Sequence, residues 1–219
     1  MEKRITIFLG EFGSGKTEMA VNYALELKAA GNNTTIVDID LVKPYFRTRE
    51  NRKLLEQNGV RVVAPDARLS SADLPILPHN LVELFAAADT KVVMDVGGGE
   101  SAIVLGQLKR YFDLSGYEAL LVVNTKRPFT STTEGIVHVL RRIEQVSRIK
   151  ISGLVSNTNL GSETTLVNVC EGLKFVQEAG AELGLTVKWA FVPKWLEQEI
   201  KLDVPLFVLE PRTRYPWMD

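Results

Sequence analysis

Cysteine and histidine are scarce in this chain of 219 residues, which has one cysteine and two histidines. Because a disulfide needs two cysteines, Cys170 cannot form one within the chain. The same scarcity leaves no C-x-x-C pair to hold zinc or an iron–sulfur cluster. His79 and His138 likewise make no metal-binding tract. We therefore expect no such metal centre in the chain acting alone.

Long apolar runs and an excess of one charge are also missing. No stretch approaches the roughly 18 apolar residues of a membrane span, and the apolar run near the start is too short for a secretory signal. Lys and Arg number 26 against 27 Asp and Glu, a net charge of -1. A balanced charge disfavours nucleic acid and anionic membranes as partners. We expect a soluble, cytoplasmic protein.

Apolar, strand-like runs alternate with helical patterns along the whole chain, without repeats or Gly/Ser linkers. We predict strands at 5–9, 35–39, 61–64, 91–96, 119–123, 151–156 and 186–192, and helices at 17–30, 47–57, 81–88, 102–112, 133–146 and 165–183. Residues 66–79 are typical of a loop, and those after 205 of an edge strand and an extended arm. This pattern predicts one three-layer α/β domain over residues 1–219, with a mostly parallel sheet of seven or eight strands covered by helices on both faces.

The segment from Gly10 to Thr17 reads GEFGSGKT, a complete G-x-x-x-x-G-K-[ST] phosphate-binding loop between the first strand and the first helix. A glycine-rich turn that opens a helix aims several backbone N–H groups at one point, which suits a polyphosphate. We predict that Lys16 reaches the β- and γ-phosphates and that the Thr17 hydroxyl binds Mg²⁺. The residues expected to contact the nucleotide here are Gly10, Phe12, Gly13, Ser14, Gly15, Lys16, Thr17 and Glu18.

Carboxylates end two further predicted strands. Asp38 and Asp40 are two residues apart, so strand alternation points both to the same side, and Asp95 precedes three glycines that include Gly98. The carboxyl ends of parallel strands meet at one edge of a sheet, where such acids can hold Mg²⁺ through water. A glycine amide after Asp95 can sense a γ-phosphate and let its loop move. Taken singly, each acid is also compatible with a helix N-cap.

Together with GLVSN at 153–157, these motifs resemble the SIMIBI class of P-loop NTPases, specifically the CobQ/CobB/MinD/ParA nucleotide-binding family that includes the nitrogenase iron protein. The resemblance spans residue 5 to about residue 195. It implies that Asp38 and Asp95 lie in the Mg²⁺ shell. It also implies that Asp40, in the first switch, orients the attacking water, and that Gly98 stands in the second switch.

For the base, the resemblance implies that Asn157 reads the adenine edge and that Pro193 lies against the ring, although Asn157 is also typical of a turn. Guanine-specific relatives carry an N-K-x-D element, whose Asp pairs with the guanine amine. Neither 124–127 (NTKR) nor 157–160 (NTNL) has that Asp. We therefore predict ATP and ADP, rather than guanine nucleotides, as ligands.

One residue of the loop departs from the MinD/ParA subgroup. Those proteins have a second lysine directly after the first glycine, which reaches across a dimer to the partner's phosphates, and this chain has Glu11 there. A carboxylate repels a facing phosphate, which puts the trans-lysine mechanism in doubt. A nucleotide-sandwich homodimer stays open, with Arg47, Arg49 or another cation as the cross-subunit charge. Arg47 and Arg49, with Arg52 and Lys53, are also typical of a solvated helix face.

Two functions fit these features. The first is a Mg²⁺-dependent ATPase, slow alone, that acts as a nucleotide-controlled switch or accessory factor for an unidentified client protein. The prolines near the end of the chain exclude the membrane helix that MinD-like proteins have, and the lack of paired cysteines excludes the dimer-bridging metal site of other relatives. The second is an ATP-dependent small-molecule kinase or ligase resembling dethiobiotin synthetase. The Lys-Pro-Tyr at 43–45 favours it faintly and is also typical of a loop.

Overall fold

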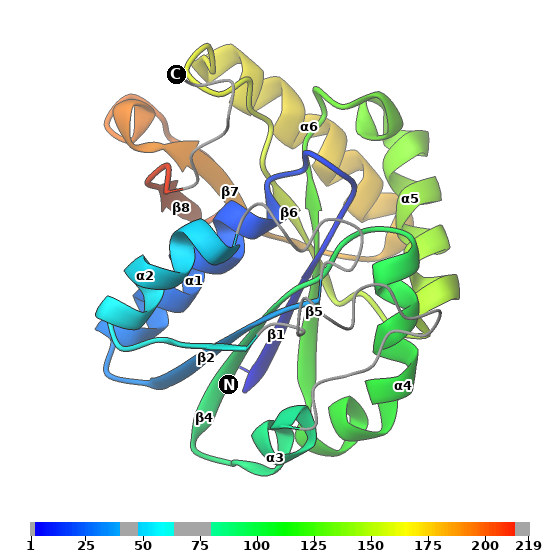
Figure 1. The fold of residues 1–219 in the computed structure, drawn as a ribbon. Coiled ribbons are helices and arrows are strands. Elements are labelled where there is room, and N and C mark those ends of the chain that lie inside the picture. The colour runs from blue at the N-terminus through cyan, green and yellow to red at the C-terminus, as the bar shows by residue number, and fades with distance from the viewer. Residues whose placement is uncertain (1–2, 40–47, 64–79, 213–219) are drawn as a thin grey trace.

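The computed structural model describes residues 3–39, 48–63 and 80–212, and these form a single parallel sheet of eight strands (Figure 1). The strand order is β3-β2-β4-β1-β5-β6-β7-β8. The strands are β1 (Ile5–Leu9), β2 (Asn33–Asp38), β3 (Arg61–Val63), β4 (Thr90–Asp95), β5 (Tyr117–Val123), β6 (Gly153–Ser156), β7 (Val187–Pro193) and β8 (Leu206–Leu209). Every neighbouring pair is parallel, so the carboxyl ends of all strands lie along one edge.

Helices cover both faces of this sheet, which gives three layers (Figure 1). They are α1 (Lys16–Ala29), α2 (Thr48–Gln57), α3 (Asn80–Ala86), α4 (Glu100–Ser115), α5 (Thr133–Ser147) and α6 (Leu166–Leu183), with short 3-10 helices η2 (Pro128–Thr130) and η3 (Lys194–Leu196). Apolar side chains of α1 and α2 pack on one face, and those of α3 to α6 pack on the other. No helix in the described ranges is long and apolar enough to cross a bilayer.

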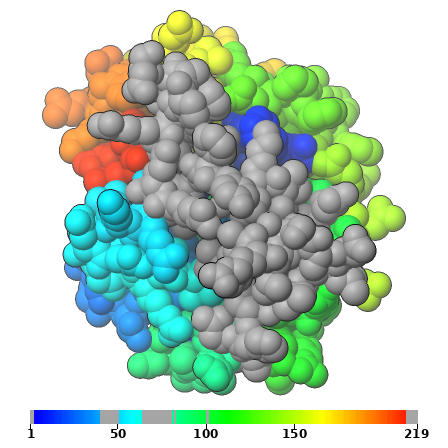
Figure 2. Space-filling view, viewed as in Figure 1, coloured from blue at the N-terminus to red at the C-terminus, as the bar shows by residue number. Residues whose placement is uncertain are grey.

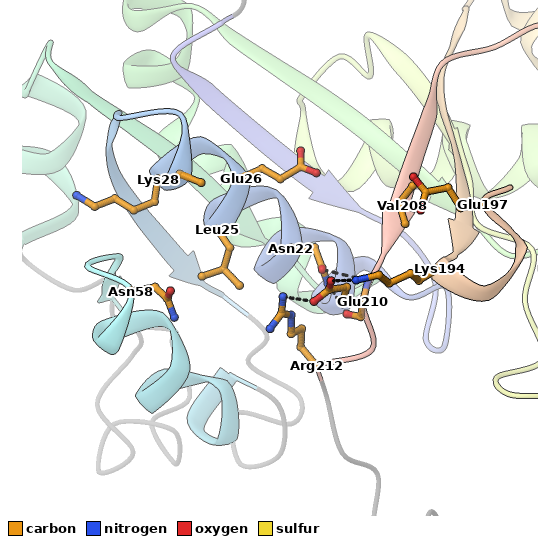
Figure 3. Close-up of a pocket in the computed structure, with 11 residues that line it drawn as sticks. Asn22, Leu25, Glu26, Lys28, Asn58, Lys194, Glu197, Val208, Glu210 and Arg212 are labelled. Carbon is orange, nitrogen blue, oxygen red and sulfur yellow. Dashed lines mark hydrogen bonds and ion pairs between the residues drawn. The ribbon is translucent and has the colours of Figure 1, made fainter.

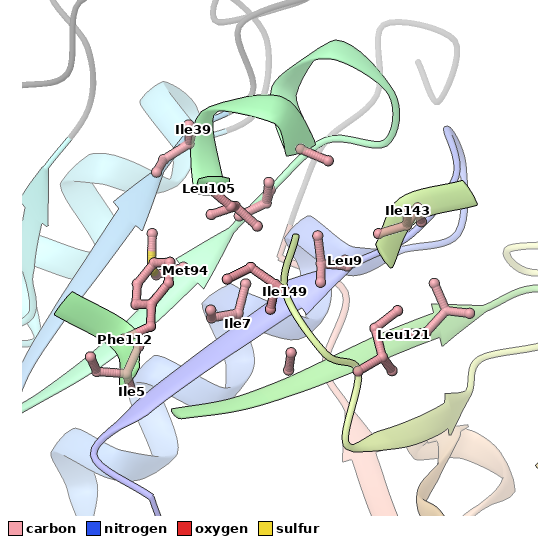
Figure 4. Close-up of a cluster of buried hydrophobic side chains, with 14 of the residues drawn as sticks. Ile5, Ile7, Leu9, Ile39, Met94, Leu105, Phe112, Leu121, Ile143 and Ile149 are labelled. Carbon is pink, nitrogen blue, oxygen red and sulfur yellow. The ribbon is translucent and has the colours of Figure 1, made fainter. Parts of the chain in front are cut away.

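The central strand β1 is the core of the molecule because its side chains alternate between the two faces. Ile5, Ile7 and Leu9 enter the cluster formed with α4 and α5 (Figure 4), whereas Phe8 enters the cluster under α1. All four are fully buried. Truncating such a side chain to alanine costs about 2–5 kcal/mol in a packed core. The end of β1, where the phosphate-binding loop begins, is therefore rigidly placed.

The structure confirms the predicted fold class, and most element bounds agree within three residues. Two of the differences are at the start of β6 and the end of α4. Strand β6 begins at Gly153 rather than at 151, and just before it the Ser152 hydroxyl accepts from Ala119 N and donates to Ala119 O, at 3.0 Å each. Helix α4 extends to Ser115, where Gly116, with φ 71°, forms its C-cap. The predicted loop 66–79 and the arm beyond 212 lie outside the described residues.

Candidate functional site

The phosphate-binding loop connects the end of β1 to the start of α1, as predicted. Gly15 is the N-cap of α1, with φ 87° and ψ 13°, and no side chain caps the helix. The N–H groups of the first turn are therefore left for a ligand. Lys16 and Thr17 are only 3% and 6% exposed. In the space-filling view, the dark blue chain that follows β1 reaches the surface beside α4 and α5 (Figure 2).

Close packing around two glycines keeps side chains out of this loop. A Cβ at Gly10 would lie 2.6 Å from Val122 O, and a Cβ at Gly15 would lie 2.0 Å from Asn157 Nδ2. The Ser14 hydroxyl is buried in the loop and has no hydrogen-bond partner among the described residues. A closely packed glycine loop that holds the buried Ser14 hydroxyl and ends at a helix start without a side-chain cap suits the phosphates of a nucleotide.

On the β5 and β6 side, amides and one guanidinium hold the loop. Asn157 Nδ2 donates to Ser14 O at 2.7 Å, and Asn124 Nδ2 donates to Gly13 O at 3.4 Å. Arg127 Nε also donates to Gly13 O, at 3.1 Å. The sequence predicts that Asn157 reads adenine. In the structure its amide nitrogen donates to the loop, and the residue is 3% exposed. Its contact with a base stays a prediction.

Sequence reasoning assigned no loop contact to Asn124 or Arg127, the first and fourth residues after β5. The available signal was a polar residue at a strand end. Asn124 is fully buried, and it also donates to Asn159 O at 3.1 Å, so it ties the loops after β1, β5 and β6 together. Buried polar side chains at strand ends commonly fix such loops.

On the β2 and β4 side, the structure brings two of the predicted acids together. Asp38 and Asp95 are register partners on adjacent strands, 7% and 2% exposed, and Asp95 is also the register partner of Phe8 on β1. Two carboxylates at neighbouring strand ends suit Mg²⁺, which takes few protein ligands besides water and phosphate. No group of three or more His, Cys, Asp or Glu gathers among the residues described. Asp40 lies outside the described residues.

Glu11, which replaces the lysine of the MinD/ParA subgroup, has a partner in its own chain. Arg142 on α5 donates from Nη2 to Glu11 Oε1, and the two side chains are 40% and 13% exposed. Gly98 packs against the start of the phosphate-binding loop, because a Cβ at Gly98 would be 3.0 Å from Gly10 O and 3.3 Å from Glu11 Oε1. No sequence signal pointed to Arg142, which is 131 residues from Glu11.

On the outer flank of α1, the end of β8 is tied to the helix that carries the loop. Glu18 Oε1 accepts a hydrogen bond from the backbone of Arg212, and Asn22 Nδ2 donates to Glu210 O at 3.1 Å. Glu210 accepts in turn from Lys194 at 2.7 Å and pairs with Arg212. Lys194 follows Pro193, which is buried at the end of β7. Glu18, a predicted nucleotide contact, and Pro193, a predicted base contact, therefore border one ion cluster.

A cavity of about 620 Å³ opens beside this cluster (Figure 3). Its lining comes from α1, the ends of β7 and β8, and Asn58 after α2, and it mixes both charges. Partial burial raises the pKa of the Glu26 carboxyl, although the residue as a whole is exposed. The hydrogen bond from Lys194 and the charge of Arg212 lower the pKa of Glu210.

Helix α2 carries Arg49, one of the residues predicted as a cross-subunit charge. Its Arg52 pairs with Glu56 at 2.8 Å, and both side chains are 50% exposed, which is the geometry of a solvated helix face. Arg47 lies outside the described residues, as does the side chain of Arg49. The cation for a sandwich dimer thus stays a prediction.

No protein-family model matches the sequence, and no curated protein matches it either. Solved structures do match. Cell division protein FtsY from Thermotoga maritima superposes with a TM-score of 0.53 at 16% identity, over 85% of this chain and 60% of that one. FlhF complexed with GTP/Mg²⁺ gives 0.52 at 16% identity, over 85% of this chain and 64% of that one.

A third structure, signal recognition particle 54 kDa protein from Aeropyrum pernix in complex with GDP, gives a TM-score of 0.52 at 18% identity, over 85% of this chain and 41% of that one. The chain spans about 60% of the length of the FtsY structure. Identities this low show the fold alone. That fold is a parallel α/β sheet covered by helices, of the P-loop NTPase type, and these three structures do not support the narrower CobQ/CobB/MinD/ParA placement.

Proposed function

We propose that this chain is a Mg²⁺-dependent nucleoside triphosphatase that acts as a nucleotide-controlled switch or accessory factor for a client protein. The observation that carries this proposal is the position of the phosphate-binding loop. It lies between the in-register acids Asp38 and Asp95 on one side and Asn124 and Asn157 on the other. A phosphate cradle with acids at the neighbouring strand ends suits binding and transfer of a phosphoryl group.

Each side chain has a defined task in this proposal. Lys16 and the N–H groups of the first turn of α1 bind the phosphates. Thr17, Asp38 and Asp95 would hold Mg²⁺, which, when bound, neutralises charge on the phosphates. Asp40 is predicted from the sequence to orient the attacking water. Gly98 lies beside the loop, where its N–H can respond to a third phosphate.

We favour ATP over GTP because the described chain offers no carboxylate where guanine-specific proteins have one. Guanine presents two kinds of N–H donor, and a site that binds them needs an acceptor. The fourth residues of the two candidate elements are Arg127, a donor, and Leu160, which is apolar and 47% exposed. The fold neighbours FlhF and the 54 kDa protein were solved with GTP and GDP, so GTP is the second candidate.

Titration calorimetry of the purified chain with ATP–Mg²⁺ and with GTP–Mg²⁺ tests both the site and the base. ATP is expected to bind, and GTP to bind at least about 10-fold more weakly. Lys16→Ala is expected to lower ATP affinity about 100-fold, since it removes a charged hydrogen-bond donor to the phosphates. Lys28→Ala, in the last turn of the same helix, is the control. Equal affinity for both nucleotides would overturn adenine selectivity, and full affinity in Lys16→Ala would overturn the site.

Hydrolysis is tested separately from binding. Asp40→Asn is expected to keep ATP affinity and to lose most of the phosphate release, measured with and without candidate clients. Loss of both together would make Asp40 a metal ligand or a structural residue. The kinase or ligase alternative depends on 43–45, outside the described residues. Turnover that requires an added metabolite would favour it.

A further inference from the structure

The pair of Glu11 and Arg142 places an anion and its counter-charge at the phosphate end of the site. Glu11 directly follows the first glycine of the loop, and its side chain is 13% exposed, so water screens it poorly. The guanidinium of Arg142 reaches it from α5, which packs between α4 and α6. Arg142 Nε is buried and has no hydrogen-bond partner among the residues described, so Nη2 makes the contact with Glu11. The carboxylate of Glu11 is thus the group that holds this arginine.

Gly98 connects the pair to the loop after β4. The closest atoms to a Cβ at Gly98 are Gly10 O and Glu11 Oε1, at 3.0 Å and 3.3 Å. The Glu11 carboxylate therefore forms part of the surface on which this loop lies. Without its partner, the negative charge of Glu11 would oppose a bound triphosphate. Its side chain would also no longer be held beside Gly98.

We propose that Arg142 is a positioning residue for triphosphate binding. By pairing with Glu11 it cancels the carboxylate charge and fixes the side chain against which the Gly98 loop rests, so that a third phosphate can be accommodated. The proposal rests on the proposed function, since it concerns the same nucleotide site. In MinD/ParA proteins the residue at the position of Glu11 is a lysine directed at a partner. Here it is a glutamate, and its counter-charge comes from the same chain.

The same helix supplies a control. Arg141 stands next to Arg142 and pairs with Glu182 on α6 at 3.7 Å, with side chains 68% and 50% exposed. Such exposed pairs contribute little to stability. Arg141→Ala therefore removes one arginine from α5 without changing the charge beside the loop.

Dissociation constants of ATP–Mg²⁺ and ADP–Mg²⁺ are measured by calorimetry for the wild type and the variants, with melting of the nucleotide-free proteins as a check of folding. Arg142→Ala is expected to weaken ATP about 10-fold and ADP less than about 3-fold, because ADP lacks the third phosphate. Adding Glu11→Gln to Arg142→Ala is expected to restore ATP affinity to within about 3-fold of the wild type. Arg142→Lys, which keeps the charge, and Arg141→Ala are expected to bind both nucleotides normally.

Three results would overturn the proposal: unchanged ATP affinity in Arg142→Ala, an equal loss for ATP and ADP, or a double variant as weak as the single one. If Arg142→Ala does not fold, Arg142→Gln in the same series gives the same comparison. A wild-type protein that binds neither nucleotide contradicts the proposed function itself. A wild type that binds both, with no effect of Arg142, contradicts this inference alone.

Discussion

The two flanks of the phosphate-binding loop are built from different chemistry. On the β4 side stand carboxylates, Asp95 and its register partner Asp38, both nearly buried. On the β5 side stand donors, because Asn124, Arg127 and Asn157 all give hydrogen bonds to loop carbonyls. The contrast separates two tasks: the donor flank fixes the shape of the loop, and the acid flank offers oxygen ligands for a cation.

The distinction matters because the two flanks should fail differently. A loop carbonyl that loses its donor leaves the backbone free to move, which harms phosphate binding with or without a metal ion. Replacing an acid by its amide keeps the size of the side chain and removes the charge that a cation would contact, so its effect should depend on Mg²⁺. Substitutions on each flank can therefore be told apart by repeating the binding measurement with a chelator.

Gly15→Ala is expected to have the largest effect, because it breaks the donor flank at its closest contact. The residue has φ 87°, and its Cβ would lie 2.0 Å from Asn157 Nδ2, so the loop or Asn157 must shift. We expect ATP affinity to fall about 100-fold and the free energy of unfolding to fall by about 1–3 kcal/mol. Calorimetry and urea denaturation measure the two.

Gly161→Ala provides the matched control, since Gly161 has φ 66° but no atom within 4 Å of its Cβ. It carries the backbone strain without the clash, and we expect it to keep ATP affinity. An equal loss in both variants would mean that strain alone, rather than contact with Asn157, explains the effect.

Asp95→Asn breaks the acid flank, and its effect should be smaller and dependent on the metal ion. We expect ATP affinity in excess Mg²⁺ to fall about 10-fold, or about 1.4 kcal/mol, with no change in EDTA. Asp113→Asn on α4, whose carboxylate pairs with Lys109 at the surface, is the control. A loss of the same size in EDTA would assign Asp95 to the shape of the loop instead of to the cation.

The fold could be predicted from the sequence because its signals are local. The run from Ile5 to Leu9, the GEFGSGKT loop and the following helix are contiguous, and several strands show as β-branched apolar runs. The acids Asp38 and Asp95 could be placed as well, since parallel strands bring their carboxyl ends to one edge.

Contacts between distant residues could not be predicted in this way. Nothing near Glu11 indicates Arg142, which lies 131 positions further on and is one of two adjacent arginines on its helix. The contact of Asn157 with the loop could not be predicted for a related reason. The sequence gives its place at the end of β6, whereas the direction of its amide, toward Ser14 O, depends on how closely Gly15 lets the loop approach.

We expect the smallest effects from two glutamates, Glu26 and Glu210, which line the cavity beyond the donor flank (Figure 3). They differ in their pairing. Hydrogen bonding by Lys194 lowers the pKa of Glu210 below its usual 4.5, whereas partial burial raises the pKa of Glu26 above that value. A lowered carboxyl pKa stabilises the fold above pH 4.5, and that stability is lost as the pH falls through the folded-state pKa. A raised one has the opposite sign: the stability is present below pH 4.5 and is lost as the pH rises.

At pH 7, Glu210→Gln should therefore lower the melting temperature and Glu26→Gln should raise it, the latter by about 2 °C or less because most of the residue remains in water. Both differences from the wild type should shrink as the pH falls below the usual carboxyl pKa, since the native glutamates then become neutral as well. Thermal melting of the two variants from about pH 4 to pH 7 measures this. Shifts of the same sign at pH 7 would show that the ion cluster around Glu210 does not set it apart from Glu26, and that it does little to hold the end of β8 against α1.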